Sequence, residues 1–289
     1  MGQLENVTQL PVLSPRRPDS NKGDYGRVLV VAGSRGMTGA AILCGTAALR
    51  GGAGLVRLAV PASEQPIVAC GNPCYMTVAL ACDEAGRLDT TASNELAKLL
   101  DANDVAAVGP GLGQSEGTTA CVKESLASST ALVLDADGLN VLRGETDLLR
   151  NRAAPLILTP HPGEFARLIR SDIGAVQRQR EELPTAFAAA HKLVLVLKGD
   201  ASLVTDGKRL YRNTTGNPGM ATGGTGDVLT GLIAALLGQG LDAFAAAQLG
   251  VHLHGLAGDL AREDRGEVSL IATDLIDYLP RVLAQRPMA

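Results

Sequence analysis

The residues of this 289-residue chain with the clearest chemical potential lie in the glycine-rich segment GNPGMATGGTGD, residues 216–227. An apolar stretch at residues 228–237 follows directly, and we expect it to be a helix. The helix would begin with the backbone amides of Gly224, Thr225 and Gly226. These three N–H groups would form an anion hole for a developing phosphate charge. Asp227 could be a simple helix cap, but a cap does not need five glycines in the preceding eleven residues. Because a carboxylate beside an anion hole can take a proton from an attacking hydroxyl, we predict that Asp227 is a general base.

Two further glycine-rich loops occur where buried strands are expected to end. GSRGMTG at 33–39 follows an apolar run, and GPGLG at 109–113 follows another. Ligands of open parallel sheets bind beyond the carboxyl ends of the strands, although either loop could be a tight turn without a ligand. The first loop has GxxGxxG spacing, and no Asp or Glu lies between Arg27 and Ser63. It therefore does not match the GxGxxG dinucleotide fingerprint, which is followed by a ribose-binding acid.

Two groups of charged residues also follow predicted strands. In TPHPGE at 159–164, Glu164 falls in the first turn of a predicted helix. Its carboxylate could interact with the helix dipole or hold a metal-bound water, and the sequence leaves both open. KGDAS at 198–202 begins where an apolar strand ends. Lys198 could contact a phosphate or be a solvated turn charge.

Histidine and cysteine spacings do not indicate a metal centre. His252 and His254 are two residues apart, and positions i and i+2 of a helix do not share a face, so we expect both to pack. The five cysteines match no zinc spacing, and we expect ordinary reduced thiols: Cys44, Cys70, Cys74, Cys82 and Cys121.

Apolar runs alternate with Ala/Leu-rich segments along most of the chain, which is typical of a parallel sheet buried on both faces. We expect strands at residues 28–32, 55–60, 105–108, 131–134, 156–158 and 194–197, and a hairpin of 202–205 and 209–211. We expect helices at residues 40–50, 94–100, 118–127, 176–191 with a break near Pro184, 227–237, 244–260 and 274–279. No Ser- or Pro-rich linker interrupts this pattern, so we expect a polar arm at 1–21 and a single α/β domain at 22–289.

The composition excludes several classes of protein. Aromatic residues make up 2% of the chain, with 3 Phe, 4 Tyr and no Trp, too few for the stacking platforms of a single-strand nucleic-acid binder. With a net charge of −4, the chain does not have the excess of basic residues that is typical of a DNA-binding protein. The sequence shows no signal-peptide core and no apolar run of membrane length. We therefore expect a cytoplasmic protein with neither nucleic-acid nor membrane partners.

The combination of motifs resembles the ADP/ATP-dependent NAD(P)H-hydrate dehydratase family of the ribokinase-like superfamily. GTGD before a late helix and TPxxxE after a middle strand are typical of the superfamily as a whole. The family resemblance adds KGDYG at 22–26, VLVVAGS at 28–34, TGA at 38–40, GPGLG at 109–113, LDADGLN at 134–140, TPHPGE at 159–164, LKG at 197–199 and GNPGMATGGTGD at 216–227. It implies a ribokinase-like three-layer α/β/α fold with a mostly parallel central sheet.

The resemblance also implies a reaction and its residues. The enzyme would use ADP to phosphorylate the hydroxyl of the S-epimer of hydrated NADH or NADPH. Elimination of phosphate would then restore NAD(P)H, with release of AMP and phosphate. Asp227 would be the catalytic base and would contact the substrate. The remaining implied contacts are Lys198, Gly199, Asp200, Ala201, Ser202 and Gly226 for the nucleotide, and Ala40, Gly113 and His161 for the hydrated dinucleotide. Gly111 and Ala41 stay open as alternatives to Gly113 and Ala40.

The resemblance further implies a cofactor and partners. Mg²⁺ is expected, held through water by Glu164, and a homotetramer is expected. A separate NAD(P)H-hydrate epimerase is expected as a pathway partner, because the residues before Lys22 are too few for the epimerase domain that some family members carry. The preference for ADP over ATP comes from the resemblance alone, and the choice between hydrated NADH and hydrated NADPH stays open.

Two other functions compete with the dehydratase. The first is an ATP-dependent kinase of a small alcohol, such as a hydroxyethylthiazole or hydroxymethylpyrimidine, that would form a stable phosphoester. Superfamily kinases usually have Asn in TPNxxE where this chain has His161, and a small alcohol needs fewer glycine-rich loops. The second is a catalytically silent dinucleotide-binding module. Binding alone gains nothing from a base such as Asp227 beside an anion hole.

Overall fold

A ten-stranded sheet runs through the part of the chain that the computed structural model describes, residues 4–150 and 152–285. The strand order is β1-β10-β9-β8-β7-β6-β5-β2-β3-β4. β9 is antiparallel to both of its neighbours, and the other neighbouring pairs are parallel. The strands are β1 Glu5–Asn6, β2 Arg27–Val31, β3 Leu55–Pro61, β4 Met76–Leu80, β5 Val105–Val108, β6 Ala131–Leu134, β7 Leu156–Leu158, β8 Val194–Leu197, β9 Leu203–Thr205 and β10 Arg209–Arg212.

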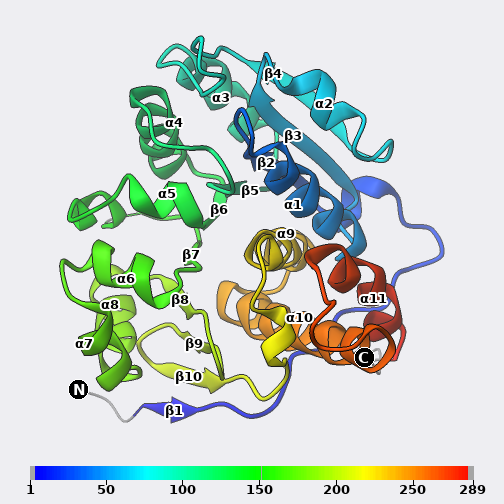
Figure 1. Cartoon of the computed structure of the whole chain (residues 1–289), viewed down its shortest axis with the longest axis vertical. Helices are drawn as coiled ribbons and strands as arrows, with labels where there is room; N and C mark the ends of the chain where they lie inside the picture. Colours follow the sequence, from blue (N-terminus) through cyan, green and yellow to red (C-terminus); the bar gives the residue numbers. More distant parts are fainter. Residues whose placement is uncertain (1–3, 151, 286–289) are drawn as a thin grey trace.

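Helices cover both faces of the sheet and complete three layers (Figure 1). One face carries α1 Thr38–Arg50, α9 Thr225–Gly238, α10 Ala243–Arg265 and α11 Ala272–Ala284. The other face carries α3 Ala92–Asp101, α4 Glu116–Ala127, α6 Pro162–Leu168, α7 Ile173–Arg178 and α8 Glu182–His191. The remaining helices are short: α2 Gln65–Ala69 and α5 Ala136–Asn140, with 3₁₀ turns η1 Lys22–Tyr25, η2 Thr146–Leu149 and η3 Pro218–Met220. The observed layers therefore match the ribokinase-like α/β/α architecture with a mostly parallel sheet that we expect from the sequence.

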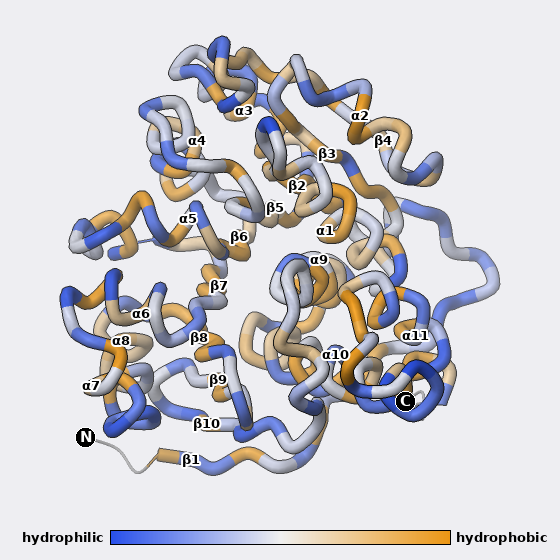
Figure 2. The backbone as a smooth tube through the Cα atoms, in the orientation of Figure 1, coloured by the Kyte–Doolittle hydropathy of each residue, from blue (hydrophilic) through white to orange (hydrophobic). Residues whose placement is uncertain are grey.

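The central strands divide their side chains between two cores. In β2, Val28 and Val30 belong to the core under α1 and α9, whereas Leu29 and Val31 belong to the core on the opposite face. Successive side chains of a strand point to opposite faces, so a strand covered on both sides is apolar throughout. Figure 2 shows the corresponding contrast between hydrophobic central segments and hydrophilic outer loops.

Helix α9 runs across the middle of the molecule and packs closely against α1. Gly231 lies at their contact, where a Cβ atom would come 2.0 Å from the carbonyl oxygen of Cys44. Ten consecutive residues of α9, from Val228 to Leu237, are buried. This burial fixes the position of the helix N-terminus, where the glycine-rich loop ends.

The structure departs from the predicted elements in a few places. β4 and α2 were not predicted, because MTVAL and QPIVA are short and only partly buried. The predicted helix at 176–191 is two helices, and the break at residues 179–181 precedes Pro184, which lies in the first turn of α8 where proline is tolerated. The chain before Lys22 is more than a surface arm, because β1 pairs with β10. No helix within the described residues is long and apolar enough to cross a membrane.

Candidate active site

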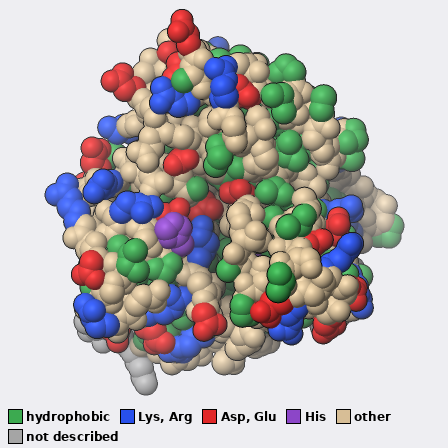
Figure 3. Space-filling view, viewed as in Figure 1, with side chains coloured by type: hydrophobic (Ala, Val, Ile, Leu, Met, Phe, Trp, Pro, Cys, Tyr) green, Lys and Arg blue, Asp and Glu red, His purple; other side chains and the backbone are tan. Residues whose placement is uncertain are grey.

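The two glycine-rich loops after β2 and β5 meet at the carboxyl edge of the sheet. β3 pairs with one side of β2 and β5 with the other, so the chain changes direction at this point. The N–H of Gly33 donates to the carbonyl of Pro110 at 2.8 Å, and Ser34 Oγ donates to the carbonyl of Gly111 at 2.8 Å. On the face of the molecule seen in Figure 3, acidic and basic side chains and a histidine gather around a central hollow.

Asp227 lies in the first turn of α9, next to the glycine-rich loop. Gly224 is the N-cap residue, with a φ of +91° that glycine adopts without strain, so Asp227 does not cap the helix. The Asp227 carboxyl makes no hydrogen bond within residues 4–150 and 152–285. Burial and the nearby charge of Asp135 raise the pKa of Asp227 to about 7, against the opposing charge of Lys198. A carboxyl with this pKa can accept a proton near neutral pH.

Lys198 follows β8 and forms a buried ion pair. Its Nζ lies 2.7 Å from Asp135 Oδ1 and 3.8 Å from Glu164 Oε2, and 18% of its side chain is exposed. Thr230 Oγ1 of α9 donates to Asp135 Oδ2 at 2.7 Å. Although burial opposes the charge of Lys198, the carboxylates of Asp135 and Glu164 hold the pKa of the ammonium above its ordinary value. Lys198 is therefore not a solvated turn charge.

His161 and Glu164 form a reciprocal cap at the start of α6. His161 Nδ1 accepts hydrogen bonds from the N–H groups of Gly163 and Glu164, and Glu164 Oε2 accepts from the N–H of His161 at 2.8 Å. Burial lowers the pKa of His161 and raises that of Glu164. Since Nδ1 accepts, the neutral imidazole carries its proton on Nε2, and half of the side chain is exposed. Glu164 thus lies in the first turn of α6, as the sequence predicts, and a metal-bound water at its carboxylate stays a prediction.

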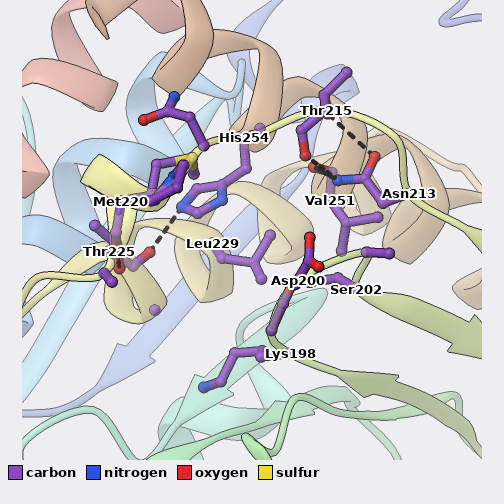
Figure 4. A pocket seen from close by; sticks show the side chains of 18 residues that line it. Lys198, Asp200, Ser202, Asn213, Thr215, Met220, Thr225, Leu229, Val251 and His254 are labelled. Atoms are coloured by element: carbon purple, nitrogen blue, oxygen red, sulfur yellow. Dashed lines mark hydrogen bonds between the residues drawn. The ribbon is translucent and has the colours of Figure 1, made fainter. Parts of the chain in front are cut away.

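A pocket of about 560 Å³ opens between the loop after β8 and the segment that leads into α9. All six residues predicted to bind a nucleotide, residues 198–202 and Gly226, line this pocket. Further lining side chains come from the segment before α9, from α9 and from α10: Asn213, Thr215, Met220, Leu229, Val251 and His254. Figure 4 shows Lys198 at one end of the lining and Thr215 with Asn213 at the other. The pocket has the size and the mixed lining of a small-molecule site.

The residues predicted to contact the hydrated dinucleotide lie outside this pocket lining. Gly113 follows β5, and its N–H donates to Asp137 Oδ2 at 2.9 Å. A Cβ on Gly111 would lie 2.8 Å from the Cβ of Ala40, so these two positions adjoin. Ala40 keeps 8% of its surface exposed whereas Ala41 keeps none, which favours Ala40 as the contact. Asp227 lies next to both regions, because it directly follows Gly226 of the pocket lining and because the charge of Asp137, which accepts from Gly113, acts on its pKa.

Comparison with known proteins decides the family. A family model described as NAD(P)H-hydrate dehydratase matches residues 28–281. The chain belongs to the NAD(P)H-hydrate dehydratase family. The bifunctional NAD(P)H-hydrate repair enzyme Nnr of Moorella thermoacetica is 48% identical over 273 residues, which are 93% of this chain and 51% of that protein. The chain thus spans about half the length of the curated relatives it matches.

Solved structures of similar proteins support the same family assignment. The ADP/ATP-dependent NAD(P)H-hydrate dehydratase of Bacillus subtilis, crystallised with ATP/Mg²⁺, superposes with a TM-score of 0.84 at 33% identity, over 95% of this chain and 94% of that one. A ribokinase-like superfamily protein of Enterococcus faecalis V583 superposes with a TM-score of 0.83 at 26% identity, over 98% and 96%. These similarities confirm the ribokinase-like fold.

Two acidic residues of this dehydratase-family site were not singled out individually from the sequence. Asp135 directly follows β6 and is 1% exposed, and Asp137 lies two residues further on in α5. Both belong to the segment LDADGLN at 134–140, which contributed to the family resemblance only as a motif. Their position after a buried strand, at the edge where ligands of parallel sheets bind, was the available signal.

The acidic residues around Lys198 have the chemistry to bind a magnesium ion. The charges of Asp135, Glu164 and Asp137 all raise the pKa of Asp227, and the ammonium of Lys198 lies near Asp135, Glu164 and Asp227. This local excess of negative charge suits a divalent cation. In the described part of the chain, no three His, Cys, Asp or Glu side chains form a metal cage. Magnesium is usually held by one or two carboxylates together with water and substrate phosphates, which agrees with such an incomplete protein site.

Proposed function

We propose that this chain dehydrates the S-epimer of hydrated NADH or NADPH with ADP, restoring NAD(P)H and releasing AMP and phosphate. One observation carries the proposal: the Asp227 carboxyl, with a pKa of about 7, directly follows Gly226, which lines the nucleotide pocket together with Lys198. A base, helix-start amides and an ammonium are what phosphoryl transfer to a hydroxyl requires. The names of the family relatives support the choice of substrate.

In the proposed reaction, the dinucleotide lies along the loops that contain Ala40 and Gly113, with its hydroxyl next to Asp227. Asp227 accepts the hydroxyl proton while the oxygen bonds to the terminal phosphorus of ADP and the bond to the AMP oxygen breaks. The amides of Thr225 and Gly226 and the ammonium of Lys198 stabilise the negative charge on the transferring group. His161 Nε2–H donates to the substrate.

Elimination completes the proposed cycle. The new phosphoester bond breaks on the carbon side, the adjacent ring carbon loses a proton, and the double bond of the reduced nicotinamide forms. Inorganic phosphate leaves with the oxygen of the former hydroxyl. Magnesium, bound with the nucleotide and a water held by Glu164, would neutralise phosphate charge. With ATP in place of ADP, the same steps release ADP.

The direct test is recovery of reduced-nicotinamide absorbance when hydrated NADH is incubated with the protein and ADP or ATP. We expect recovery with at least one nucleotide, and hydrated NADPH tested in parallel gives the dinucleotide preference. A failure to recover absorbance with either nucleotide would refute the proposal. A small-alcohol kinase would instead produce a stable phosphoester from a hydroxyethylthiazole or hydroxymethylpyrimidine with ATP.

The oligomeric state, the source of the S-epimer and the location in the cell stay predictions. We expect a homotetramer, which light scattering after size-exclusion chromatography tests. A separate NAD(P)H-hydrate epimerase is expected to supply the S-epimer, and incubating this chain with the R-epimer alone tests whether it needs one. A cytoplasmic location is expected, and cell fractionation tests it.

A further inference from the structure

Helix α10 holds the glycine-rich loop at both of its ends. At the start of the loop, Asp259 accepts hydrogen bonds from the N–H of Gly216 at 2.8 Å and from Asn217 Nδ2 at 3.0 Å. At its end, His254 Nε2 lies 2.9 Å from the carbonyl oxygen of Thr225, the first residue of α9. His254 thus contacts the same helix start that supplies the anion-hole amides.

This contact determines which nitrogen of His254 carries a proton. A carbonyl oxygen can only accept, so Nε2 must be the donor to Thr225. Burial lowers the pKa of His254 to about 4, so the ring is neutral near pH 7. A neutral imidazole with its hydrogen on Nε2 has an unprotonated Nδ1, which is a hydrogen-bond acceptor.

The acceptor Nδ1 of His254 faces the nucleotide pocket. Among the described residues, Nδ1 has no hydrogen-bond partner. It is also not one of the fully buried polar atoms that lack a partner there, so it is not sealed off from the pocket. His254 lines the pocket. In Figure 4 one ring nitrogen is joined to Thr225, and the other lies on the opposite side of the ring, toward the interior of the pocket above Leu229. The pocket therefore presents a fixed, unsatisfied acceptor.

We propose that His254 is a nucleotide-specificity residue: its Nδ1 accepts a hydrogen bond from the nucleoside part of ADP, while its Nε2–H holds Thr225 and the start of α9. The donor is either a ribose hydroxyl or the exocyclic amino group of adenine, because these are the neutral donors that the nucleoside offers. This inference rests on the nucleotide site proposed above. An acceptor at this place disfavours a base that presents a carbonyl instead, since two acceptors would face each other.

One substitution separates the two roles of His254. In His254→Gln, the side-chain amide can still donate to the carbonyl of Thr225, but it has no acceptor at the position of Nδ1. We expect ADP to bind about five- to tenfold more weakly, the effect of losing one neutral hydrogen bond, without a change in the thermal unfolding temperature. His254→Leu loses both contacts and should also lower kcat, because the anion hole is no longer held. His252→Gln, on the same helix but outside the pocket lining, is the matched control and should bind ADP normally.

The experiment is calorimetric titration of wild type and His254→Gln with ADP, 2′-deoxy-ADP, 3′-deoxy-ADP and inosine diphosphate. The analogue that lacks the donor should bind wild type about five- to tenfold more weakly than ADP and should bind His254→Gln with no further loss. The other analogues should keep the full effect of the substitution. Equal ADP affinity of wild type and His254→Gln would overturn the inference, and so would an equal loss for all four nucleotides. If wild type binds neither ADP nor ATP, the nucleotide site itself is wrong, which is a distinct result.

Discussion

The ammonium of Lys198 lies 2.7 Å from Asp135 Oδ1, between the strand that precedes Lys198 and the helix that carries Asp227. Asp135 is almost fully buried, and its second oxygen accepts a hydrogen bond from Thr230 of α9. The pair thus joins β6, β8 and α9 at one point. Because both charges are near Asp227 and act on its pKa in opposite directions, the pair also sets the strength of the proposed base.

Removing the charge of Asp135 and removing the charge of Lys198 should shift the pH dependence of the reaction in opposite directions. The charge of Asp135 raises the pKa of Asp227, so Asp135→Asn should lower the pH midpoint of kcat/KM. Lys198 lowers that pKa, so Lys198→Met should raise the midpoint, and it should also raise the KM for ADP. Thr230→Val removes the hydrogen bond to Asp135 but no charge, and it should leave the midpoint in place. Shifts in the same direction for both charge variants would contradict the account.

The wild-type pH profile should report the raised pKa of Asp227. A base must be deprotonated in the free enzyme, so kcat/KM should rise about tenfold per pH unit below pH 7 and level off above it. Initial rates between pH 5 and 9 at low substrate concentration measure this. A profile that is flat down to pH 5 would place the base elsewhere.

Asp227→Asn should make the protein more stable at alkaline pH. The pKa of Asp227 rises from 3.8 to about 7 on folding, so between these values the unfolded chain loses its proton while the folded chain keeps it. This difference lowers the free energy of unfolding as pH rises, with the full loss above pH 7. Asn removes the loss, so the variant should unfold at a higher temperature than wild type at pH 8, with a smaller gain at pH 5. An equal gain at both values would show that ionisation of Asp227 is not the cause.

Gly226→Ala should weaken nucleotide binding without unfolding the protein. The new Cβ would lie 3.3 Å from Lys198 Nζ and so would occupy the space expected for a phosphate. We expect ADP affinity to fall by at least tenfold in a binding titration. Gly223→Ala is the matched control in the same loop, because its Cβ would meet no atom within 4 Å. Equal losses in the two variants would indicate a general effect on the loop.

The sequence was sufficient for elements whose residues are uniformly buried. β5, β6, β7 and β8 have the predicted bounds, because an apolar run between turns has one favourable place in a sheet covered on both faces. β4 was missed because its burial is mixed. Helix ends were underestimated where polar residues continue a helix, as in the last turns of α10.

The site was predictable where chemistry is local to one segment. The glycine-rich loop alone indicates Asp227 and Gly226 as site residues, and the segment KGDAS indicates one side of the pocket. The contact between Lys198 and Asp135 joins residues 63 positions apart, and no spacing rule indicates it. The sequence predicts a packing role for His254 because positions i and i+2 of a helix do not share a face. Its contact with Thr225, which belongs to a different helix, is visible only in the structure. Such long-range contacts require the fold.

The most direct measurement is the product balance for wild type and Asp227→Asn supplied with hydrated NADH, ADP and magnesium. We predict that wild type forms reduced nicotinamide, AMP and phosphate in equal amounts. We expect Asp227→Asn to be slower by two or more orders of magnitude while still binding ADP. A stable phosphorylated product without recovered NADH, or unchanged turnover in Asp227→Asn, would contradict this account.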